Sequence, residues 1–398
     1  MLIVHVSDSH LGYRQYGLVE RERDLYACFE EVVSRALEEH VDAVVHSGDL
    51  FHSPNPPPQA YRSTMRALKM LKQRGIPFLY VMGQHDRPKT QTLAPTSVLE
   101  DMDLLIHVSE KPYVNGDYSV VGLDYSRRQI LKEKLQGLRP LTKRCVLAMH
   151  VLLKEVSPLG DLSISEVPKG FSYYALGDYH IFKTFKVHGS IAAYPGSSEI
   201  ISLNDMTETG KGFCIVDLSG DEAKVEFQRL EGVRPRIVAE VAFDEIKGLV
   251  AKIASQARSM KLKPLIHLTV KGVGVKRKDL DKVKEELESV SLRTFISIEE
   301  LEVPLPSPGR ASFGGVEEVI SSLLPDVDNV VVGIYRAFKA GDLHAELERL
   351  YNSGDWLKVS LQPSSEKAPS RPSKAAPHPT KAKSSTILGW LARDNRED

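Results

Sequence analysis

The sequence predicts an α/β fold in which two layered β-sheets are flanked by helices. In the first half of the chain, short apolar stretches alternate with stretches whose apolar residues recur at helical spacing. Several apolar stretches also end in Asp or His, at the position where a strand of an α/β sheet would present a ligand. The chain has 398 residues, of which 42% are hydrophobic, and this is enough for two domains and a tail.

The elements of this first half can be placed in order. Between residues 25 and 39 five apolar side chains fall on one helical face, and residues 61–74 have the same spacing. The predicted strands cover residues 2–6, 41–46, 78–82, 118–123, 145–150 and 173–176. Residues 212–217 and 224–229 predict a hairpin around Ser219-Gly220-Asp221.

A second, smaller α/β unit follows, because residues 237–298 alternate strand, helix, strand, helix and strand. Two short amphipathic helices are expected at residues 316–323 and 342–351. Residues 362–385 are rich in proline and serine and have no apolar period, which predicts disorder. The predicted organisation is a first domain (1–205), a small domain (206–302), a linker (303–315), a helical segment (316–361) and a disordered tail (362–398).

The composition excludes few functions. The 52 Lys and Arg nearly cancel the 53 Asp and Glu, so net charge argues neither for nor against nucleic acid. Three cysteines stand far apart with no CxxC pair, which argues against a zinc ribbon and suits a reducing cytosol. The first residues predict a strand and not a signal peptide, and no stretch approaches the roughly 18 apolar residues of a membrane span. We therefore expect a cytoplasmic, DNA-associated protein without a membrane segment.

Asp, His and amide side chains gather directly after five of the predicted strands. They are Asp8 and His10, Asp49 and His52, Gln84, His85 and Asp86, His150, and Asp178 and His180. Because ligands of α/β sheets bind at the carboxyl ends of the strands, we expect these side chains to lie together. Each piece alone is typical of an ordinary turn or a core histidine. Five pieces in this order predict a metal centre.

The residue types indicate the chemistry. Two divalent cations about 3.5–4 Å apart can activate a water and hold both the attacking and the leaving oxygen of a phosphodiester. Carboxylate, imidazole and amide ligands without a thiolate favour manganese or iron over zinc. A further histidine outside the coordination sphere can donate a proton to the leaving oxygen.

With these motifs the sequence resembles the calcineurin-like metallophosphoesterase superfamily, and more closely the Mre11/SbcD nucleases. The segments that carry the resemblance are residues 5–14 (HVSDSHLGYR), 44–52 (VVHSGDLFH), 173–180 (YYALGDYH) and 194–197 (YPGS). The resemblance covers about residues 1–300. It implies a manganese-dependent DNA exo/endonuclease of a double-strand-break repair complex, with residues 206–302 as a capping, DNA-binding domain.

The resemblance also implies a role for each residue. One metal would be held by Asp8, His10, Asp49 and His180, and the other by Asp49, Gln84, His150 and Asp178, with Asp49 as the bridge. The implied metals are two Mn²⁺, in preference to Mg²⁺ or Fe²⁺. His85, held by Asp86, would assist the leaving group, and His52 would contact the scissile phosphate.

Two positions depart from the family pattern, which has Asn at position 84 and His at position 178. Gln84 and Asp178 are still oxygen ligands, but both changes fall on the same metal. They leave open a weakened or more manganese-selective site, and also a non-catalytic DNA-binding or scaffold paralogue. A metallophosphatase of the same superfamily is a further alternative.

Two basic runs predict contacts to DNA. Residues 258–278 hold seven Lys or Arg and no acid, and residues 127–144 hold seven against one acid. A solvated face is the alternative explanation.

The partner predictions concern the C-terminal third. The resemblance places residues 316–361 where the family binds its coiled-coil ATPase, of the Rad50/SbcC type, and a homodimer is expected. The many apolar residues of this segment suit a partner groove, although packing on the chain's own domains is the alternative. Residues 384–391 read Ser-x-x-Ile-x-x-Trp-Leu and resemble peptides that dock on the replication sliding clamp. The alternative is an apolar end that folds back on the first domain.

Overall fold

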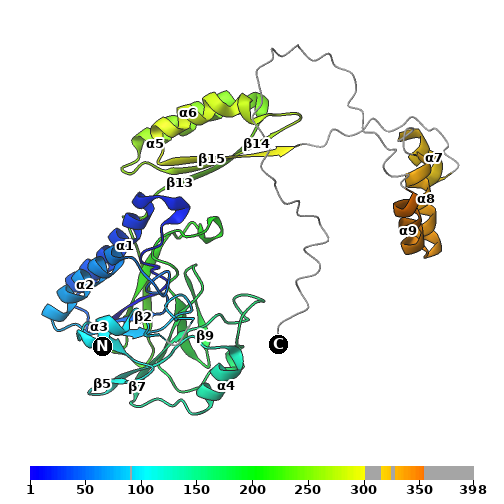
Figure 1. The fold of residues 1–398 in the computed structure, drawn as a ribbon. Helices are drawn as coiled ribbons and strands as arrows, with labels where there is room; N and C mark the ends of the chain where they lie inside the picture. Colours follow the sequence, from blue (N-terminus) through cyan, green and yellow to red (C-terminus); the bar gives the residue numbers. More distant parts are fainter. Residues whose placement is uncertain (90–91, 301–314, 324–327, 354–398) are drawn as a thin grey trace, which may run out of the picture. The chain divides into compact units, whose positions relative to one another are not determined.

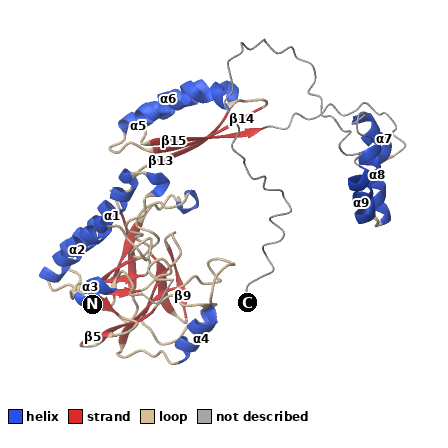
Figure 2. Ribbon diagram, viewed as in Figure 1, coloured by secondary structure: helices blue, strands red, loops and turns tan. Residues whose placement is uncertain are grey.

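The structure, a computed structural model, describes residues 1–89, 92–300, 315–323 and 328–353. Two six-stranded sheets form the centre of the first domain (Figure 2). This domain extends to β12 and so beyond the predicted boundary at residue 205, because β11 and β12 pair into the first sheet. The first sheet has the order β12-β11-β1-β2-β3-β4. Its strands are β1 (Leu2–Val6), β2 (Ala43–Ser47), β3 (Phe78–Val81), β4 (Ile106–His107), β11 (Gly212–Asp217) and β12 (Lys224–Arg229).

The second sheet has the order β5-β6-β7-β8-β10-β9. Its strands are β5 (Tyr113–Asn115), β6 (Tyr118–Leu123), β7 (Arg144–His150), β8 (Tyr173–Gly177), β9 (Lys183–Val187) and β10 (Ser190–Tyr194). The strands β1 to β4 pair in parallel, and so do β6, β7, β8 and β10. Parallel pairing brings the carboxyl ends of neighbouring strands to one edge of each sheet, which is where the candidate site lies.

The two sheets pack face to face through a shared apolar core. Val45 and Leu79 come from the first sheet, Val146 and Ala175 come from the second, and all four are fully buried. Strands that are buried on both faces read as continuous apolar runs and not as alternation. This explains why β2 and β7 are recognisable in the sequence.

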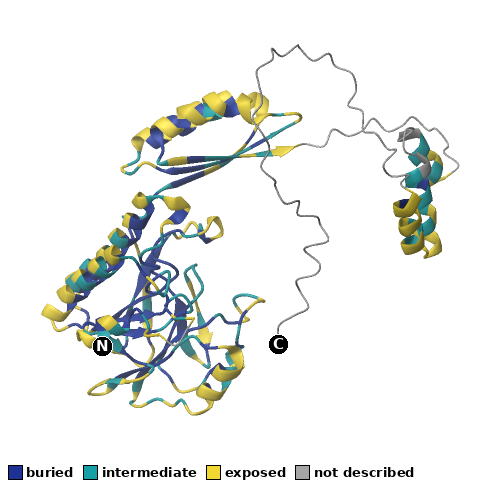
Figure 3. Cartoon of the chain, in the orientation of Figure 1, coloured by how far each residue is buried: buried dark blue, intermediate teal, exposed yellow. Residues whose placement is uncertain are grey.

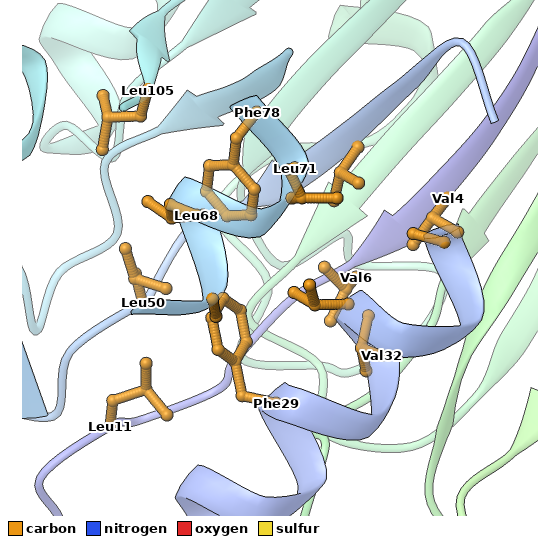
Figure 4. Packing of buried hydrophobic residues seen from close by; sticks show 14 of the residues in the cluster. Val4, Val6, Leu11, Phe29, Val32, Leu50, Leu68, Leu71, Phe78 and Leu105 are labelled. Atoms are coloured by element: carbon orange, nitrogen blue, oxygen red, sulfur yellow. The ribbon is translucent and has the colours of Figure 1, made fainter. Parts of the chain in front are cut away.

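Helices α1 (Val19–Glu38) and α2 (Pro58–Gln73) cover the outer face of the first sheet (Figure 1). Figure 4 shows Phe29 of α1 and Leu68 and Leu71 of α2 in one cluster with Phe78 of β3. Each such side chain stabilises the fold by about 1.5–3 kcal/mol when fully buried. The short helix α3 (Ser97–Asp101) adds to the first layer, and α4 (Arg128–Gln136) packs on the second sheet.

The small domain is a three-stranded parallel sheet covered by two helices. Its strands are β13 (Arg236–Ala242), β14 (Leu265–Gly272) and β15 (Arg293–Glu300), and its helices are α5 (Ile246–Ser259) and α6 (Asp281–Val290). Val250 and Ile253 of α5 and Leu287 of α6 are buried with Leu268 of β14. In Figure 3 the outer surfaces of the two helices are exposed.

The described residues of the C-terminal segment, 315–323 and 328–353, belong to a unit separate from the first 303 residues. Its described helices are α7 (Val316–Leu323), α8 (Asp328–Ala340) and α9 (Leu343–Ser353), and α8 contacts both of the others. Among the helices of the described residues, none has the length and apolar character that a membrane crossing requires.

The layered sheets with flanking helices and the small α/β unit confirm the predicted fold class. The C-terminal segment differs from the expectation of two helices, because α8 lies between them. The predicted linker at 303–315, apart from its last residue, the tail at 362–398 and its motif at 384–391 lie outside the described residues.

Candidate metal centre

The loops that follow β1 and β2 are joined backbone to backbone. The amide of Asp8 donates to the Gly48 carbonyl (3.0 Å), and the amide of His10 donates to the Asp49 carbonyl (3.0 Å). Across the sheets, the amide of Asp178, after β8, lies 3.2 Å from Asp8 Oδ2. These contacts bring side chains from three separate strand ends into one buried cluster.

The first cluster consists of Asp8, His10 and His180, whose ligand atoms all lie within 4.8 Å of one another. His180 Nε2 lies 3.8 Å from Asp8 Oδ1 and 3.3 Å from His10 Nε2. Asp8 and His10 are almost completely buried. Buried imidazole and carboxylate groups that converge in this way form a typical divalent-metal site.

The second cluster consists of Asp49, His150, Asp178 and Gln84. His150 Nε2 lies 3.5 Å from Asp49 Oδ2 and 3.8 Å from Asp178 Oδ1. The Gln84 amide donates to Asp178 Oδ1 at 2.8 Å. Asp49 Oδ2 is also 3.8 Å from His10 Nε2 of the first cluster. Asp49 therefore faces both clusters, which is the position that a bridging carboxylate needs.

Three buried polar atoms of the second cluster have no hydrogen-bond partner: Asp49 Oδ2, His150 Nε2 and Gln84 Oε1. A buried polar atom without a partner costs about 1–3 kcal/mol, so native structures rarely leave one. All three atoms are ligand atoms for a hard or borderline divalent cation. Their residues thus fit a bound metal, which would occupy the free lone pairs.

The backbone of the site is strained in a consistent way. Asp8, His10, Asp49 and Asp178 have φ angles of 51°, 45°, 56° and 91°, a region that non-glycine residues rarely adopt. Such conformations cluster at functional sites because the surrounding structure holds them. A Cβ at Gly83 would collide with the Asp49 carboxylate, so only glycine permits this close approach.

His52 and His85 lie at the mouth of the centre. The side chain of His85 is 38% exposed, and its Nε2 lies 3.9 Å from Asp49 Oδ2. The ring of His52 stacks on Tyr13, with 3.9 Å between the ring centroids. Both histidines are thus placed where a substrate could reach them.

The expected support of His85 by Asp86 is wrong. His85 Nδ1 lies 3.0 Å from the His52 carbonyl oxygen. The Asp86 carboxylate instead accepts hydrogen bonds from the backbone amides of Leu50 and Phe51 and from the Tyr80 hydroxyl. Through these hydrogen bonds the fully buried Asp86 holds the loop after β2. The ring of His85 is oriented instead by a backbone carbonyl.

The titratable groups of the site differ in the direction in which their surroundings shift the pKa. Burial raises the pKa of Asp49, but His150 and His10 outweigh this and hold that pKa well below its usual range. Burial lowers the pKa of His10, whereas the carboxylates around His150 outweigh burial and raise its pKa. Burial and the neighbouring His85 lower the pKa of His52 to about 4, so His52 is neutral at physiological pH.

Two residues that contact the site histidines are not identified by the sequence alone. Tyr13 stacks on His52, and Asp205 contacts the ring of His180 at 3.2 Å. Tyr13 lies in the first motif, but no spacing rule pairs it with position 52. Asp205 stands 25 residues after its partner, in a 3₁₀-turn without a motif of its own.

The comparisons with known proteins point to one family. The calcineurin-like phosphoesterase family matches residues 1–208. The DNA double-strand break repair protein Mre11 of Sulfurisphaera tokodaii is 34% identical over 301 residues, covering 72% of this chain and 78% of that protein. The protein of the same name from Saccharolobus solfataricus is 36% identical over 294 residues, covering 70% and 77%. That of Methanocaldococcus jannaschii is 35% identical over 263 residues, covering 62% and 72%.

The fold and the site thus define a calcineurin-like phosphoesterase. Within this class, the chain belongs to the archaeal Mre11 family.

Proposed function

We propose that the chain is a DNA double-strand break repair nuclease that hydrolyses phosphodiester bonds with two divalent metal ions, manganese being preferred. The observation that carries the proposal is Asp49, whose unpartnered buried oxygen faces histidines of both clusters. The family match and the relatives, which are named DNA double-strand break repair proteins, support the substrate class.

In this proposal each metal takes four residues of the chain. Asp8, His10, Asp49 and His180 hold one, and Asp49, Gln84, His150 and Asp178 hold the other. When bound, the metals supply an activated water and stabilise the charge on the attacking and leaving oxygens. The shared carboxylate, ionised because its pKa is held low, keeps the two sites together.

His85 protonates the leaving oxygen in this proposal. A carbonyl only accepts hydrogen bonds, so the contact with the His52 carbonyl requires a proton on His85 Nδ1. When His85 carries its second proton, Nε2 can deliver it on the side that faces Asp49. Neutral His52, with its ring fixed by Tyr13, contacts the scissile phosphate as a hydrogen-bond donor.

The experiment compares cleavage of single-stranded DNA with hydrolysis of a nucleotide monoester, in Mn²⁺, in Mg²⁺ and in EDTA. We expect DNA cleavage that is faster in Mn²⁺ and absent in EDTA, with little monoester hydrolysis. His85→Ala should lower cleavage by about 10²–10⁴-fold, because a general acid is lost, while Mn²⁺ binding is retained. His344→Ala is the matched control, since the side chain of His344 is 93% exposed.

Each alternative function has its own outcome in this experiment. Monoester hydrolysis that exceeds DNA cleavage would indicate a phosphatase. A wild-type chain that binds DNA but neither binds metal nor cuts would indicate a scaffold paralogue. Cleavage by His85→Ala at the rate of His344→Ala would remove His85 from the mechanism.

In the small domain, the basic run that is expected to contact DNA is partly neutralised. Lys271 pairs with Glu240 (2.8 Å) and with Glu299 (3.4 Å). Lys261, Arg277 and Lys278 are exposed and remain candidates for phosphate contacts.

We also propose that the α7–α9 unit binds a coiled-coil ATPase. Leu347 and Tyr351 of α9 stand one helical turn apart and are 46% and 75% exposed, and Phe338 of α8 is 68% exposed. Large apolar side chains exposed in so small a unit are typical of a groove or helix interface.

A further inference from the structure

The imidazole of His180 is held at both of its nitrogens. On one side, Nε2 faces Asp8 Oδ1 (3.8 Å) and His10 Nε2 (3.3 Å) in the first cluster. On the other side, Nδ1 lies 3.2 Å from Asp205 Oδ2. An ionised carboxylate only accepts, so this contact requires a proton on Nδ1. The neutral ring then presents the lone pair of Nε2 to the cluster, as a metal ligand must.

Asp205 is itself fixed in place. It ends the 3₁₀-turn Leu203–Asp205, and the same Oδ2 accepts the backbone amide of Ser202 at 2.8 Å. Asp205 is only 8% exposed. Burial raises the pKa of Asp205, but the hydrogen bond from His180 and the nearby charges outweigh it and lower that pKa.

The backbone of His180 is anchored separately from its ring. The buried ammonium of Lys211 donates to the His180 carbonyl at 2.6 Å and to Ser197 Oγ at 2.9 Å. Lys211 also places a positive charge near Asp205. Main chain and ring are thus fixed by two different partners, and of Lys211 and Asp205 only Asp205 contacts the ring and acts on the tautomer.

We propose that Asp205 is a positioning residue that fixes the tautomer and the ring orientation of His180 and so strengthens metal binding at the cluster of Asp8, His10 and His180. The inference rests on the proposed function for the identity of that cluster as a metal site. It adds a residue outside the coordination sphere, of the kind that tunes affinity by orienting a ligand.

The test measures Mn²⁺ binding to the full, metal-stripped chain by calorimetry, without DNA. We expect Asp205→Ala to weaken binding at one site by about 10–100-fold, because outer-shell partners of metal-ligating histidines have effects of this size. Asp205→Asn should weaken it less, since an amide oxygen can still accept from His180 Nδ1. Equal affinity in the wild type and Asp205→Ala would overturn the proposal.

Ser202→Ala is the matched control for a merely structural role. The Ser202 hydroxyl accepts the Asn204 amide of the same turn at 3.3 Å, so its loss loosens the turn and leaves the Asp205 carboxylate in place. We expect metal affinity to stay near the wild-type value in this variant. A loss as large as that of Asp205→Ala would show that the turn, and not the carboxylate, matters.

A second readout does not depend on metal at all. With ¹⁵N-labelled histidine, and a His180→Gln variant to assign the signal, NMR of the metal-free chain reports the tautomer of His180. We expect the Nδ1–H form in the wild type and a mixture of tautomers in Asp205→Ala. If the wild type binds no metal, the proposed function fails, and the tautomer still decides the role of Asp205: an unchanged tautomer in Asp205→Ala overturns it.

Discussion

Gln84 and Asp178, the two positions that depart from the family pattern, are bonded to each other. The Gln84 amide donates to Asp178 Oδ1 at 2.8 Å and leaves Gln84 Oε1 buried without a partner. The extra methylene of Gln, relative to Asn, gives the amide its reach, and a carboxylate at position 178 gives it an acceptor. The two departures therefore compensate each other and leave one amide oxygen free for a metal.

This pairing predicts coupled mutational effects. Gln84→Asn or Asp178→His alone should weaken binding of the second Mn²⁺, because each leaves its partner without its hydrogen bond. The double variant restores the family pattern and should bind better than the sum of the single losses predicts, with a coupling energy of about 0.5–3 kcal/mol. Calorimetric titration of the four proteins completes the cycle. Additive losses would mean that the two residues act independently.

His5 lies on β1, the strand that leads into the site, and makes hydrogen bonds through both ring nitrogens. It contacts the Tyr173 hydroxyl at 2.7 Å and Ser47 Oγ at 2.8 Å, and it is fully buried. Burial, together with the nearby His46, lowers the pKa of His5 from 6.5 to about 3. Between these two pH values the unfolded chain binds a proton on His5 that the folded chain does not. The free energy of unfolding must then fall as the pH falls.

We expect this effect to appear as a slope difference between the wild type and His5→Gln. In the wild type His5 contributes a loss of about 1.4 kcal/mol per pH unit on acidification through that window, and the variant lacks this loss. Asp86, whose pKa is raised by burial to about 7, changes stability in the opposite sense, but it does so in both proteins and cancels. Urea unfolding of the metal-free proteins across this range gives the two slopes. Parallel slopes would mean that folded His5 is protonated.

Among the strands, those that are most buried are the ones that the sequence predicts most clearly. Strands β1, β2, β7 and β8 are fully or almost fully buried, so their apolar runs and the ligands after them are visible in the sequence. Edge strands are different. β9, with two exposed lysines, and β5, with only a partly buried Tyr113, are short and largely exposed, and the sequence does not predict them. It also misses the inner strand β10, a short strand whose first two residues are only partly buried.

The residues of the candidate site also differ in how far the sequence predicts them. Its strand-end residues follow from motif order, and the structure brings all seven predicted metal ligands into the two clusters. Their assignment as ligands stays a prediction. The residues around them depend on contacts between distant segments, as with Asp205 beside His180 and the His52 carbonyl beside His85. Nothing in the local sequence encodes such contacts, and the resemblance implies Asp86, not the His52 carbonyl, as the support of His85.

At the scale of the whole molecule, a buried ion network joins the small domain to the first domain. The Arg234 guanidinium, just before β13, donates to both oxygens of Asp24 on α1, at 2.6 and 2.8 Å. Arg21 contacts Asp24 at 2.6 Å and Glu199 at 3.2 Å. Glu199 lies in the loop after β10, in which the Ser197 amide donates to the His180 carbonyl. Glu199 also accepts the Arg234 amide at 3.0 Å. The entry to the small domain is thus tied to the loop that borders the metal centre.

Breaking this network should loosen the small domain. Arg234 and Asp24 are each 7% exposed, and removing one partner of a buried ion pair typically costs about 3–5 kcal/mol, because the other charge stays buried. We expect Arg234→Ala to lower the free energy of unfolding by an amount of this order, and to speed protease cleavage between β12 and β13.

Arg293→Ala is the control, since Arg293 lies on β15 of the same domain and is exposed, where substitutions usually change stability by no more than about 0.5 kcal/mol. Denaturant unfolding and timed proteolysis of the metal-free proteins measure both quantities. Asp24 keeps Arg21 as a partner in Arg234→Ala. We therefore expect Asp24→Ala to be the more damaging change, because it removes a partner from both Arg21 and Arg234, although Arg21 keeps Glu199. If Arg234→Ala and Arg293→Ala unfold at the same denaturant concentration, this network does not hold the domains together. The ring contact of Tyr16 with Phe295 and the hydrogen bonds of Arg236 to Gln15 and Ile200 would then do so.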